Sequence, residues 1–547
     1  MKIAVAGFSR RPLLAALSVL ATACLQSSKS SGTGNTSPPP PPDTCDGVPA
    51  IPAGQPFTVS GNVTYDFVPA TYDPSTSVGG LDFARSEQRP VREAVVEVRQ
   101  CETVRATTTT DGAGHYSATF TPTATGQVAV YVLARVASPP LLVRDNTSNA
   151  TWAVAQQIAS TSATLDLHAT HGWTGTHYGS SRIAAPFAIL DSMYTASRRL
   201  LDLPRAVPFD SVPLAVNWSP QNTPASIGTS YYDPSLRQIF LLGAEGIDTD
   251  EFDREVIVHE WGHYFEDSFS RSDSFGGPHG FGDVLDPRLS FGEGYASAFA
   301  AMLLQQTIYA DTYWGSFGMD AFGWDVETRP SPTDDPTPGA LSELSVIRAM
   351  WDLYDSGTNE PAFDGVALGL GPIYDTLVGP ERTTPALTTL ASFVAGLKAQ
   401  SGVDPAAAAA VDAVLAHHGI GPITTEWGDG DTQLSLMFRD VAVPSSFTES
   451  LDGSYRWNER PQNQYYVFTA AGTHVTVTSS STLDVDLYGV HVGTILAAAE
   501  STSGNETIGF DTTPGEVYVV VLTGWGGISS GQSGVGAYTA TIGFASP

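Results

Sequence analysis

The chain has 547 residues, of which 42% are hydrophobic and only 15% charged, and its formal net charge at pH 7 is -31. A chain of this length is too long for one hydrophobic core and predicts about three domains. Its acidic surface would repel nucleic acids and anionic lipids, so neither is expected as a direct partner.

The N-terminus has the pattern of an export signal. Two arginines and an apolar run over residues 13–20 precede small residues that end at Cys24. The segment resembles a bacterial lipoprotein signal, whose cysteine becomes the lipidated first residue, although such signals usually have leucine where this chain has Ala21. An ordinary secretory signal cleaved nearby is the alternative. We expect a signal peptide at 1–23 and an exported protein, either a lipoprotein of the outer membrane or cell surface anchored at Cys24 or a secreted protein. Mass spectrometry of the mature N-terminus distinguishes the two, because an acylated Cys24 is heavier than a simple cleavage product.

Export also bears on the remaining thiols and on the segment after the signal. Cys45 and Cys101 are the other cysteines, and in an oxidising compartment we expect a Cys45–Cys101 disulfide, with two separate thiols as the alternative.

Residues 24–55 are rich in Ser, Gly and Pro, including an unbroken proline run at 38–42. They predict an extended tether, with a tail of no function as the alternative. After the signal, no apolar run reaches the roughly 18 residues that span a bilayer, so membrane contact is expected only through the lipid anchor.

Residues 56–150 predict a small β-sandwich. Short runs with alternating apolar residues are separated by Gly, Asp and Pro, as antiparallel strands require. The segment TTTDGAGHYS at 108–117 has an Asp-Gly turn followed by Gly-x-Tyr, and it resembles the carboxypeptidase regulatory-like domain of exported bacterial proteins. The resemblance implies a structural or binding role without catalysis, with His115 in a turn or strand.

The spacing of apolar residues changes after this region. Over residues 183–201 they recur three and four apart and predict a helix. Residues 214–216 and 238–242 look like strands, and the position of the second suggests the edge strand with which zinc peptidases pair an extended substrate. We expect Thr249 or Asp250 to cap the next helix, with acids in its first turns that favour the helix dipole, Glu251 and Asp253.

That helix carries the motif HEWGH at 259–263. Residues four apart lie on one face of a helix, so His259 and His263 can bind one metal ion, and Glu260 beside them can take a proton from water. A catalytic zinc site has three protein ligands, so a third is needed. The metzincin pattern is excluded, because it requires Gly and His where this chain has Glu266 and Phe269.

A second helical run at 290–304 opens with the letters SFGEGYA. It resembles the glutamate helix of the gluzincin peptidases, which packs against the HExxH helix and supplies the third ligand. Together with a helical run at 344–355, these motifs resemble a group of exported bacterial metallopeptidase-like proteins over about 180–420. Carried over position by position, the resemblance implies a polypeptide substrate, Glu260 as general base, and Zn2+ bound by His259, His263 and Glu293.

Several roles around this site stay open. Glu293 can instead be an acid favoured by a helix N-terminus. Thermolysin-type enzymes have an acid four residues after the ligand glutamate, where this chain has Ser297, so the group that orients a zinc histidine must come from elsewhere. The candidates for that group are Asp283, Asp286 and Asp352. The candidates for a donor to the transition state, each of which can equally be a packing or surface residue, are Tyr354, His279, His417 and His418. His279 is also a rival third ligand.

An alanine-rich helix is predicted at 406–416, with Pro405 at its start and Gly419 after its end. After it, apolar residues again alternate with polar ones, which predicts strands. The letters DVDLY at 484–488 and the final YTAT resemble the bacterial pre-peptidase C-terminal domain. The resemblance implies a jelly-roll β-sandwich over 424–547. Its acids Asp484 and Asp486 can bind Ca2+, with solvated acids at a strand end as the alternative.

The prediction is a multidomain protein in which a mixed α/β, zincin-like and largely helical domain at 151–423 is flanked by two β-sandwiches. We expect it to be a monomer that hydrolyses peptide bonds in extracellular proteins or peptides with the help of zinc. The alternative is a non-enzymatic surface-binding or adhesion lipoprotein whose central domain holds zinc without cutting. The intact Glu260 favours the enzyme.

Overall fold

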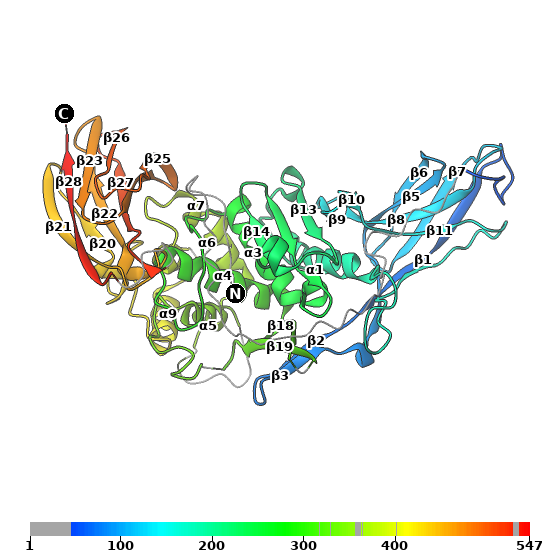
Figure 1. Ribbon diagram of the computed structural model, residues 1–547, viewed down its shortest axis with the longest axis horizontal. Coiled ribbons are helices and arrows are strands. Elements are labelled where there is room, and N and C mark those ends of the chain that lie inside the picture. Colours follow the sequence, from blue (N-terminus) through cyan, green and yellow to red (C-terminus); the bar gives the residue numbers. More distant parts are fainter. Residues whose placement is uncertain are drawn as a thin grey trace. The chain divides into compact units, whose positions relative to one another are not determined.

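The computed structural model describes residues 45–316, 318–328, 330–355, 363, 365–400, 402–528 and 535–546. Within them the chain forms two compact units: the first unit contains 45–264 and Phe299–Asp325, and the second contains Phe265–Ala298 and 326–546. The protein is multidomain and mixed α/β, as predicted, with an N-terminal β region, central helices and a C-terminal β domain (Figure 1). The predicted signal peptide and Cys24 lie outside the described residues.

The N-terminal part of the first unit consists mainly of antiparallel strands. Strand β7 (His115–Phe120) is alternately exposed and buried, so its period-two pattern gives it one face in the core. It pairs with β1 (Phe57–Phe67), which also pairs with β4 (Glu87–Pro90) and, in parallel, with β12 (Leu167–Ala169). His115 opens β7, in agreement with its predicted place in a strand.

A nine-stranded sheet continues from this region into the central part of the chain. Its main path, in spatial order, is β14 (Tyr231–Asp233), β15 (Gln238–Leu241), β13 (Leu214–Trp218), β9 (Leu141–Asp145), β8 (Val128–Val136), β5 (Ala94–Gln100) and β6 (Thr103–Thr109). Two short strands pair with β9 and β8, namely β10 (Ala150–Thr151) and β11 (Ala153–Gln157). Because β9 pairs in parallel with β13, the sheet runs across residue 150, near which a domain boundary was predicted. The predicted domain boundaries themselves stay predictions.

The prediction that residues 238–242 form an edge strand is wrong. Strand β15 pairs with β13 on one side and with β14 on the other, so β14 is the edge of the sheet. A strand as short as β14 has too few residues to show a period-two pattern. The edge of the sheet was therefore not visible in the spacing of apolar residues.

The first unit also contains a long helix, a further sheet and several short elements. Helix α1 (Ala184–Leu201) packs against β8 and β9, and the predicted helix is confirmed. A four-stranded sheet contains β16 (Gly243–Ala244), β17 (Asp248–Thr249), β18 (Ile308–Gly315) and β19 (Gly318–Asp325). The short elements elsewhere in this unit are the hairpin of β2 (Ala70–Asp73) and β3 (Val78–Leu81) and the helix α2 (Pro224–Ile227).

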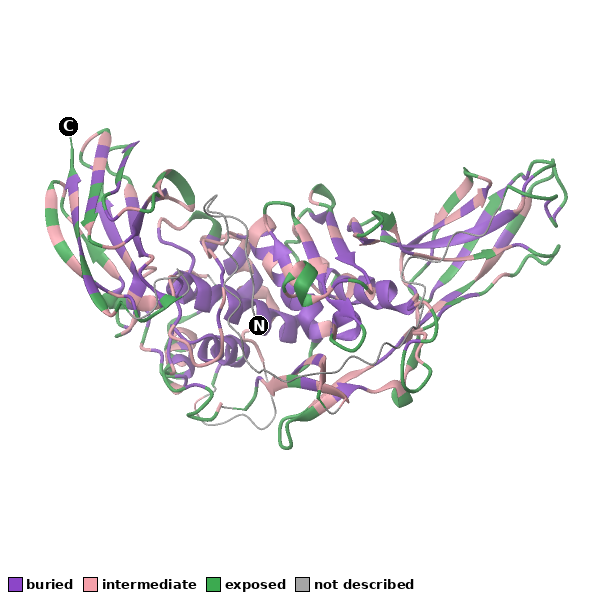
Figure 2. Cartoon of the chain, viewed as in Figure 1, coloured by how far each residue is buried: buried purple, intermediate pink, exposed green. Residues whose placement is uncertain are grey.

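Helices α3 (Arg254–Phe269) and α4 (Pro287–Leu304) contribute residues to both units. Every residue of α4 is buried, including the charged Arg288 and Glu293, as expected for a helix with apolar residues on all its faces. The other helices of the second unit are α5 (Glu343–Tyr354), α6 (Leu370–Val378), α7 (Pro380–Thr383), α8 (Leu390–Lys398) and α9 (Pro405–His417). Figure 2 shows that the central helices are buried over most of their length. In the described part of the chain, no helix has the length and apolar character needed to cross a membrane.

The C-terminal domain is a sandwich of two sheets. One has the order β20 (Phe438–Asp440), β22 (Asn463–Thr469), β27 (Val517–Gly524), β24 (Val485–His491) and β25 (Thr494–Ala499). The other has the order β21 (Ser445–Asp452), β28 (Ala537–Ala545), β23 (His474–Ser481) and β26 (Thr507–Asp511). Successive strands change sheet at almost every step along the chain, which is the connectivity of a jelly roll. The core between the sheets includes Phe468, Val477, Val520 and Ile542.

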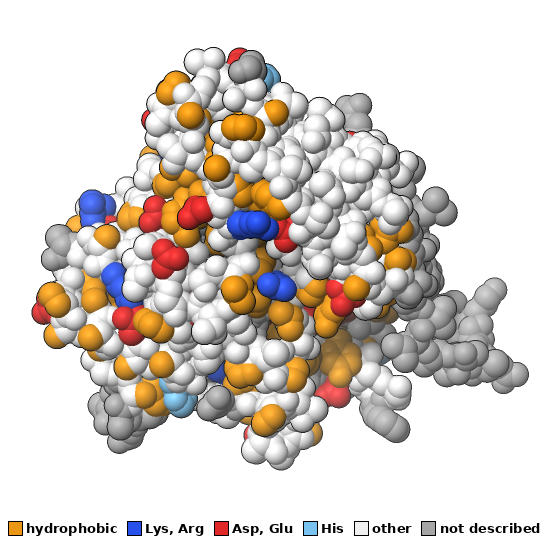
Figure 3. All heavy atoms as spheres, turned by 90° about the vertical axis from the view of Figure 1, so that its left-hand side faces the viewer, with side chains coloured by type: hydrophobic (Ala, Val, Ile, Leu, Met, Phe, Trp, Pro, Cys, Tyr) orange, Lys and Arg blue, Asp and Glu red, His pale blue; other side chains and the backbone are white. Residues whose placement is uncertain are grey.

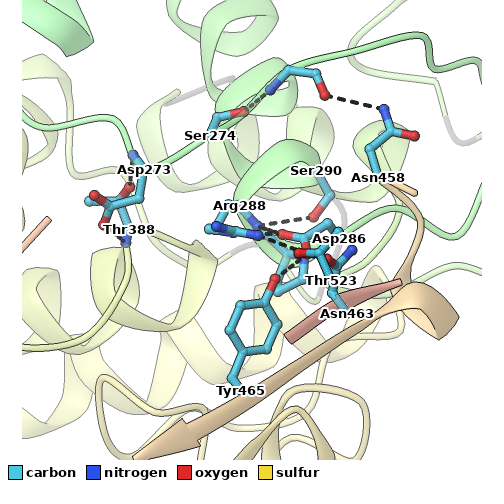
Figure 4. A network of polar contacts seen from close by, with 12 residues as sticks. Asp273, Ser274, Asp286, Arg288, Ser290, Thr388, Asn458, Asn463, Tyr465 and Thr523 are labelled. Carbon is cyan, nitrogen blue, oxygen red and sulfur yellow. Dashed lines mark hydrogen bonds and ion pairs between the residues drawn. The ribbon is translucent and has the colours of Figure 1, made fainter. Parts of the chain in front are cut away.

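A buried polar network joins this sandwich to the segment that leads into α4 (Figure 4). Asp286 accepts hydrogen bonds from the Tyr465 hydroxyl of β22 and from the guanidinium of Arg288. The Arg288 guanidinium also lies over the Tyr465 ring, 5.1 Å from its centroid. Asn458 donates to the carbonyl of Pro278 at 2.9 Å. Because a buried carboxylate is stable only with charged or hydrogen-bonding partners, this network fixes the start of α4 against the sandwich.

The face of the molecule seen in Figure 3 carries few charged side chains. In the space-filling view of Figure 3, uncharged atoms cover most of the visible face, and acidic and basic side chains are scattered between them. This agrees with the composition, in which only 57 acids and 26 bases occur among the 547 residues. The large negative net charge therefore reflects the shortage of bases.

Candidate metal centre

His259 and His263 lie one turn apart on α3. His259 is fully buried and His263 is half-buried. The Nε2 atoms of the two rings are 3.1 Å apart, and the ring planes meet at 85°. The two imidazoles therefore converge on one point, as their spacing on the helix predicts.

This geometry fits a zinc ion. Two nitrogens at the usual Zn–N distance of about 2.0–2.1 Å in a tetrahedral arrangement lie roughly 3.3 Å apart. The separation of 3.1 Å between the two Nε2 atoms is close to that value. Glu260 completes a group in which one ligand atom from each residue lies within 4.8 Å of the others. Imidazole nitrogens with a carboxylate beside them are donors that suit Zn2+.

Glu260 is fully buried and is held from the backbone of the nearby sheet. Its Oε2 accepts a hydrogen bond of 2.9 Å from the N–H of Tyr232, the central residue of the edge strand β14. This bond fixes the orientation of the carboxylate through one of its two oxygens. A carboxylate fixed beside two converging imidazoles can act as a general base towards water bound there.

Aromatic packing holds another side of α3. The indole of Trp261 stacks near Phe299 of α4, with ring centroids 6.5 Å apart, and lies 5.9 Å from the ring of Phe209. The hydroxyl of Tyr264 donates to the carbonyl of Val212 at 2.6 Å. These contacts limit rotation of the helix about its axis, and so they fix the direction of the two histidines.

The start of α3 differs from the prediction. The helix begins at Arg254, because Asp250–Phe252 form a separate 3₁₀ turn, η3. The side chain of Thr249 makes no capping hydrogen bond to η3. Asp253, expected in the first turn of the helix, precedes it and accepts the N–H of Thr312 at 2.6 Å. The predicted caps are wrong because α3 starts only at Arg254 and because Asp250 and Asp253 accept hydrogen bonds from the distant residues Ser230 and Thr312.

Glu293 is buried in α4, which begins at Pro287. It lies beyond the first turn, so the alternative role of an acid favoured by the helix N-terminus is excluded. Its Oε2 is 3.7 Å from Nε2 of His279, and the same nitrogen is 3.7 Å from Oε2 of Glu343. Glu293 belongs to the second unit and the two histidines of α3 to the first, so its role as third ligand stays a prediction.

The glycine after Glu293 has a packing role. A Cβ atom at Gly294 would lie 2.6 Å from Cβ of Val346 in α5, closer than side chains can approach. At Gly292 the nearest atom would be Cβ of Ser274 at 3.4 Å, an ordinary contact. Only the second glycine of the Gly-Glu-Gly pattern is therefore required for the close approach of α4 to α5.

The three candidates for orienting a zinc histidine have other partners in the second unit. Asp283 forms an ion pair with Arg456, and Asp286 belongs to the network of Figure 4. Asp352 lies with Oδ2 2.7 Å from Nε2 of His418. His418 also lines a cavity of about 440 Å³ whose other lining residues are mostly prolines. These contacts locate Asp283, Asp286, Asp352 and His418 in the second unit. The proposed roles of these residues at the metal site stay predictions.

The other candidate donors to the transition state also lie in the second unit. The ring of His417 stacks on Phe363, with centroids 3.5 Å apart, and Tyr354 lies beside Trp351. His279 is buried, with Nδ1 3.1 Å from the carbonyl oxygen of Gly277. The choice among these donors stays open.

Asp484 and Asp486 are the candidate calcium ligands of the C-terminal domain, and calcium binding there stays a prediction. Among the described residues, neither belongs to a group of acids or histidines with ligand atoms close enough for one ion. Asp486 is fully buried and accepts hydrogen bonds from the Trp525 indole and, at 3.3 Å, from the Tyr488 hydroxyl. For Asp486 the alternative of a solvated acid at a strand end is therefore wrong.

Two features beside α3 were not predicted. The first is the bond from Tyr232 to Glu260, which uses a backbone N–H and leaves no signature in the residue types. The second is a group of three carboxylates, from Asp248, Asp250 and Asp311. The spacing of the first two, which alternate around Thr249, is a weak signal of a shared strand face. Asp311 is brought next to these two residues only by the pairing of β17 with β18, which the sequence does not reveal.

Comparisons with known proteins show only weak similarity. No family model and no curated protein matches this sequence. The C-terminal β domain resembles the pre-peptidase C-terminal domain of a collagenase from Bacillus anthracis, at 12% identity over 20% of this chain and 93% of that one, with a TM-score of 0.16. PliG of Aeromonas hydrophila, a periplasmic inhibitor of g-type lysozyme, matches at 11% identity over 20% of this chain and 95% of that one, with a TM-score of 0.16. CorA of Methylomicrobium album, a surface-associated copper-binding protein, matches at 11% identity over 20% and 98%, with a TM-score of 0.15. Similarities this weak carry no argument about function.

Proposed function

We propose that this protein is a zinc-dependent peptidase that hydrolyses peptide bonds in extracellular proteins or peptides. The observation that supports this most is the convergence of the His259 and His263 Nε2 atoms, 3.1 Å apart, beside the buried carboxylate of Glu260. Structural zinc sites are closed by four protein ligands, mostly Cys and His. A pair of histidines with a carboxylate held beside them fits a hydrolytic site better.

The residues of the proposed site have distinct roles. His259, His263 and, by the resemblance to gluzincins, Glu293 would hold the ion. Bound zinc supplies Lewis-acid chemistry, since it polarises a carbonyl group and lowers the pKa of water. Glu260 takes a proton from the attacking water and then passes it to the nitrogen of the leaving amine. The N–H of Tyr232 keeps the Glu260 carboxylate in one orientation for both proton transfers.

Export is part of the same proposal. The signal pattern before Cys24 supports a lipid anchor at that residue or, as the alternative, secretion after cleavage nearby. Cys45 is exposed and Cys101 half-buried in the first unit, and both would meet an oxidising compartment after export. We therefore keep the disulfide between them, and a monomeric state, as proposals.

Metal analysis combined with a protease assay tests the proposed function. The purified full chain is expected to contain one zinc ion per molecule and to cleave casein, and 1,10-phenanthroline is expected to abolish cleavage until zinc is added back. His263→Ala should lose both zinc and cleavage, because one of the two converging imidazoles is gone. The control is His474→Ala, at a partly exposed histidine of β23 in the sandwich, which should keep both.

The result also separates the enzyme from the alternative. Stoichiometric zinc without chelator-sensitive cleavage of casein or gelatin would contradict a peptidase. It would support a surface-binding protein whose central domain holds zinc without cutting. Zinc content that is unchanged in His263→Ala would contradict the assignment of the site itself.

A further inference from the structure

A second group of converging carboxylates lies just before α3, entirely within the first unit. Asp248 is in β17, Asp250 opens η3, and Asp311 is in β18. One carboxylate oxygen from each lies within 4.8 Å of the others. Strands β17 and β18 pair antiparallel with Asp248 opposite Tyr313, which brings Asp250 next to Asp311 on the same face.

Burial leaves part of this group without partners. Asp250 is only 2% exposed; its Oδ2 accepts a hydrogen bond from Ser230, whereas its Oδ1 has no hydrogen-bond partner among the described residues. Within the same residues, Oδ1 of Asp248 is also buried without a partner. Burial, and then the like charges of Asp248, Asp311 and Asp253, raises the pKa of Asp250 well above its ordinary value. Ionised carboxylates gathered in this way are unfavourable unless a cation balances them.

Tyr309 is an independent sign of a ligand at this place. It lies two residues before Asp311 on β18, and so on the same face of the strand. Its side chain is 4% exposed, and its hydroxyl has no hydrogen-bond partner in the part of the chain that the structure describes. Burial, and then the charge of Asp311, raises the pKa of this hydroxyl. Buried polar atoms without partners are rare in folded proteins and commonly mark a water or an ion.

We propose that Asp248, Asp250 and Asp311 bind a calcium ion. Carboxylate oxygens are ligands of hard cations, whereas zinc sites use mainly nitrogen and sulfur. Calcium binds oxygens at about 2.3–2.6 Å, so any two ligands of one ion must lie within roughly 5 Å of each other. The three carboxylate oxygens meet this condition. The Tyr309 hydroxyl and water molecules can complete the six to eight ligands that calcium takes.

The ion would join η3 to β18 at the point where α3 begins. Asp250 lies shortly before Arg254, the first residue of α3. Between them, Asp253 already holds Thr312 of β18 through the backbone N–H at 2.6 Å and the side-chain hydroxyl at 2.9 Å. Calcium would add a second link and remove the repulsion between the carboxylates. It would thereby stabilise the N-terminal end of the helix that carries His259, whether or not the protein cleaves peptides.

Thermal unfolding of the full chain tests the proposal. In zinc-saturated protein, about 5 mM Ca2+ is expected to raise the melting temperature by about 2–4 °C, and Mg2+ by less. Asp311→Asn is expected to abolish this shift. In the absence of calcium the same variant should melt above the wild type, because it removes one of the repelling charges. Asp320→Asn, on the neighbouring strand β19 and outside the group, is the matched control and should keep the calcium shift.

Terbium luminescence adds a measurement that does not depend on stability. Tb3+ bound at this group is expected to be excited through Tyr309 and to be displaced by Ca2+, and Asp248→Asn should weaken its binding at least about tenfold. A calcium shift of equal size in wild type and Asp311→Asn would overturn the proposal. Bound Tb3+ that is not displaced by Ca2+ would also overturn the proposal. A proton shared between Asp248 and Asp250 would then account for the buried carboxylates.

Discussion

The Glu260→Gln variant is expected to bind zinc as the wild type does and to cleave casein about 10³-fold more slowly, since a positioned general base typically contributes 10²–10⁴-fold. Glutamine has the shape of glutamate, and its amide oxygen can still accept the N–H of Tyr232. It cannot take a proton from water near neutral pH. The substitution therefore removes proton transfer while His259 and His263 stay in place. Initial rates of cleavage and zinc content measured on the same preparation check both parts of the expectation.

A second variant on the same helix provides the control. Glu255 is buried one turn before His259, and burial raises its pKa to about 7. Below neutral pH its carboxyl group is therefore largely protonated, and glutamine is a close substitute for that form. Glu255→Gln is expected to keep zinc and most of the cleavage activity at pH 6. Cleavage at the wild-type rate by Glu260→Gln would show that Glu260 is not the base, whereas loss of zinc would show that it supports the metal site.

The elements that the sequence predicts well are those whose signals are local. Helix α9 begins at Pro405, with the side chain of Asp404 accepting two backbone N–H groups of its first turn. It ends shortly before Gly419, whose φ of +75° is readily adopted only by glycine. The strands of the C-terminal sandwich are predicted for the same reason, because apolar and polar residues alternate within each strand. The spacing of His259 and His263 is local in the same sense.

What the sequence does not predict depends on contacts between distant segments. Asp250 has the residue type of a helix cap, but it lies in η3 among carboxylates from β17 and β18. Asp253 binds Thr312, which comes from a strand that follows α4. Local propensity is too weak to decide such cases, because a tertiary hydrogen bond to a charged group is worth about 1.5–3 kcal/mol and a cap about 1 kcal/mol. The approach of α4 to α5 is a further case, since it becomes visible only when the space at Gly294 is known.

Arg182→Met is expected to lower the free energy of unfolding of the first unit by about 3–5 kcal/mol and its melting temperature by roughly 10 °C. Glu251, predicted in the first turn of α3, is instead fully buried in η3 and pairs with Arg182 at 2.6 Å. Arg182 is itself only 3% exposed and also donates to the carbonyl of Gly243. Methionine fills the space but leaves the charge of Glu251 buried without its partner. Urea unfolding followed by tryptophan fluorescence measures the loss.

The pH dependence of that loss tests its cause. Burial raises the pKa of Glu251, and the charge of Arg182 partly opposes the increase, so the pKa rises further when Arg182 is removed. A carboxyl group with a higher pKa in the folded than in the unfolded chain stabilises the fold fully below its unfolded pKa of about 4.3, and this contribution is lost as pH rises through the folded pKa. Relative to the wild type, Arg182→Met should therefore be destabilised more at pH 8 than at pH 5.

Two further variants distinguish the effect of leaving the Glu251 charge buried without a partner from the effect of losing an arginine side chain. Arg198→Met breaks an exposed pair with Asp202 in the last turn of α1, and it should cost less than about 1 kcal/mol because solvent already screens both charges.

The double variant Arg182→Met/Glu251→Leu leaves no buried charge and should recover most of the stability lost in Arg182→Met. Some loss should remain, since the carbonyl of Gly243 then lacks its donor. If the double variant were as unstable as Arg182→Met, the guanidinium contacts with Gly243 and with the rings of Tyr178 and Trp218 would account for the effect, and the charge of Glu251 would not.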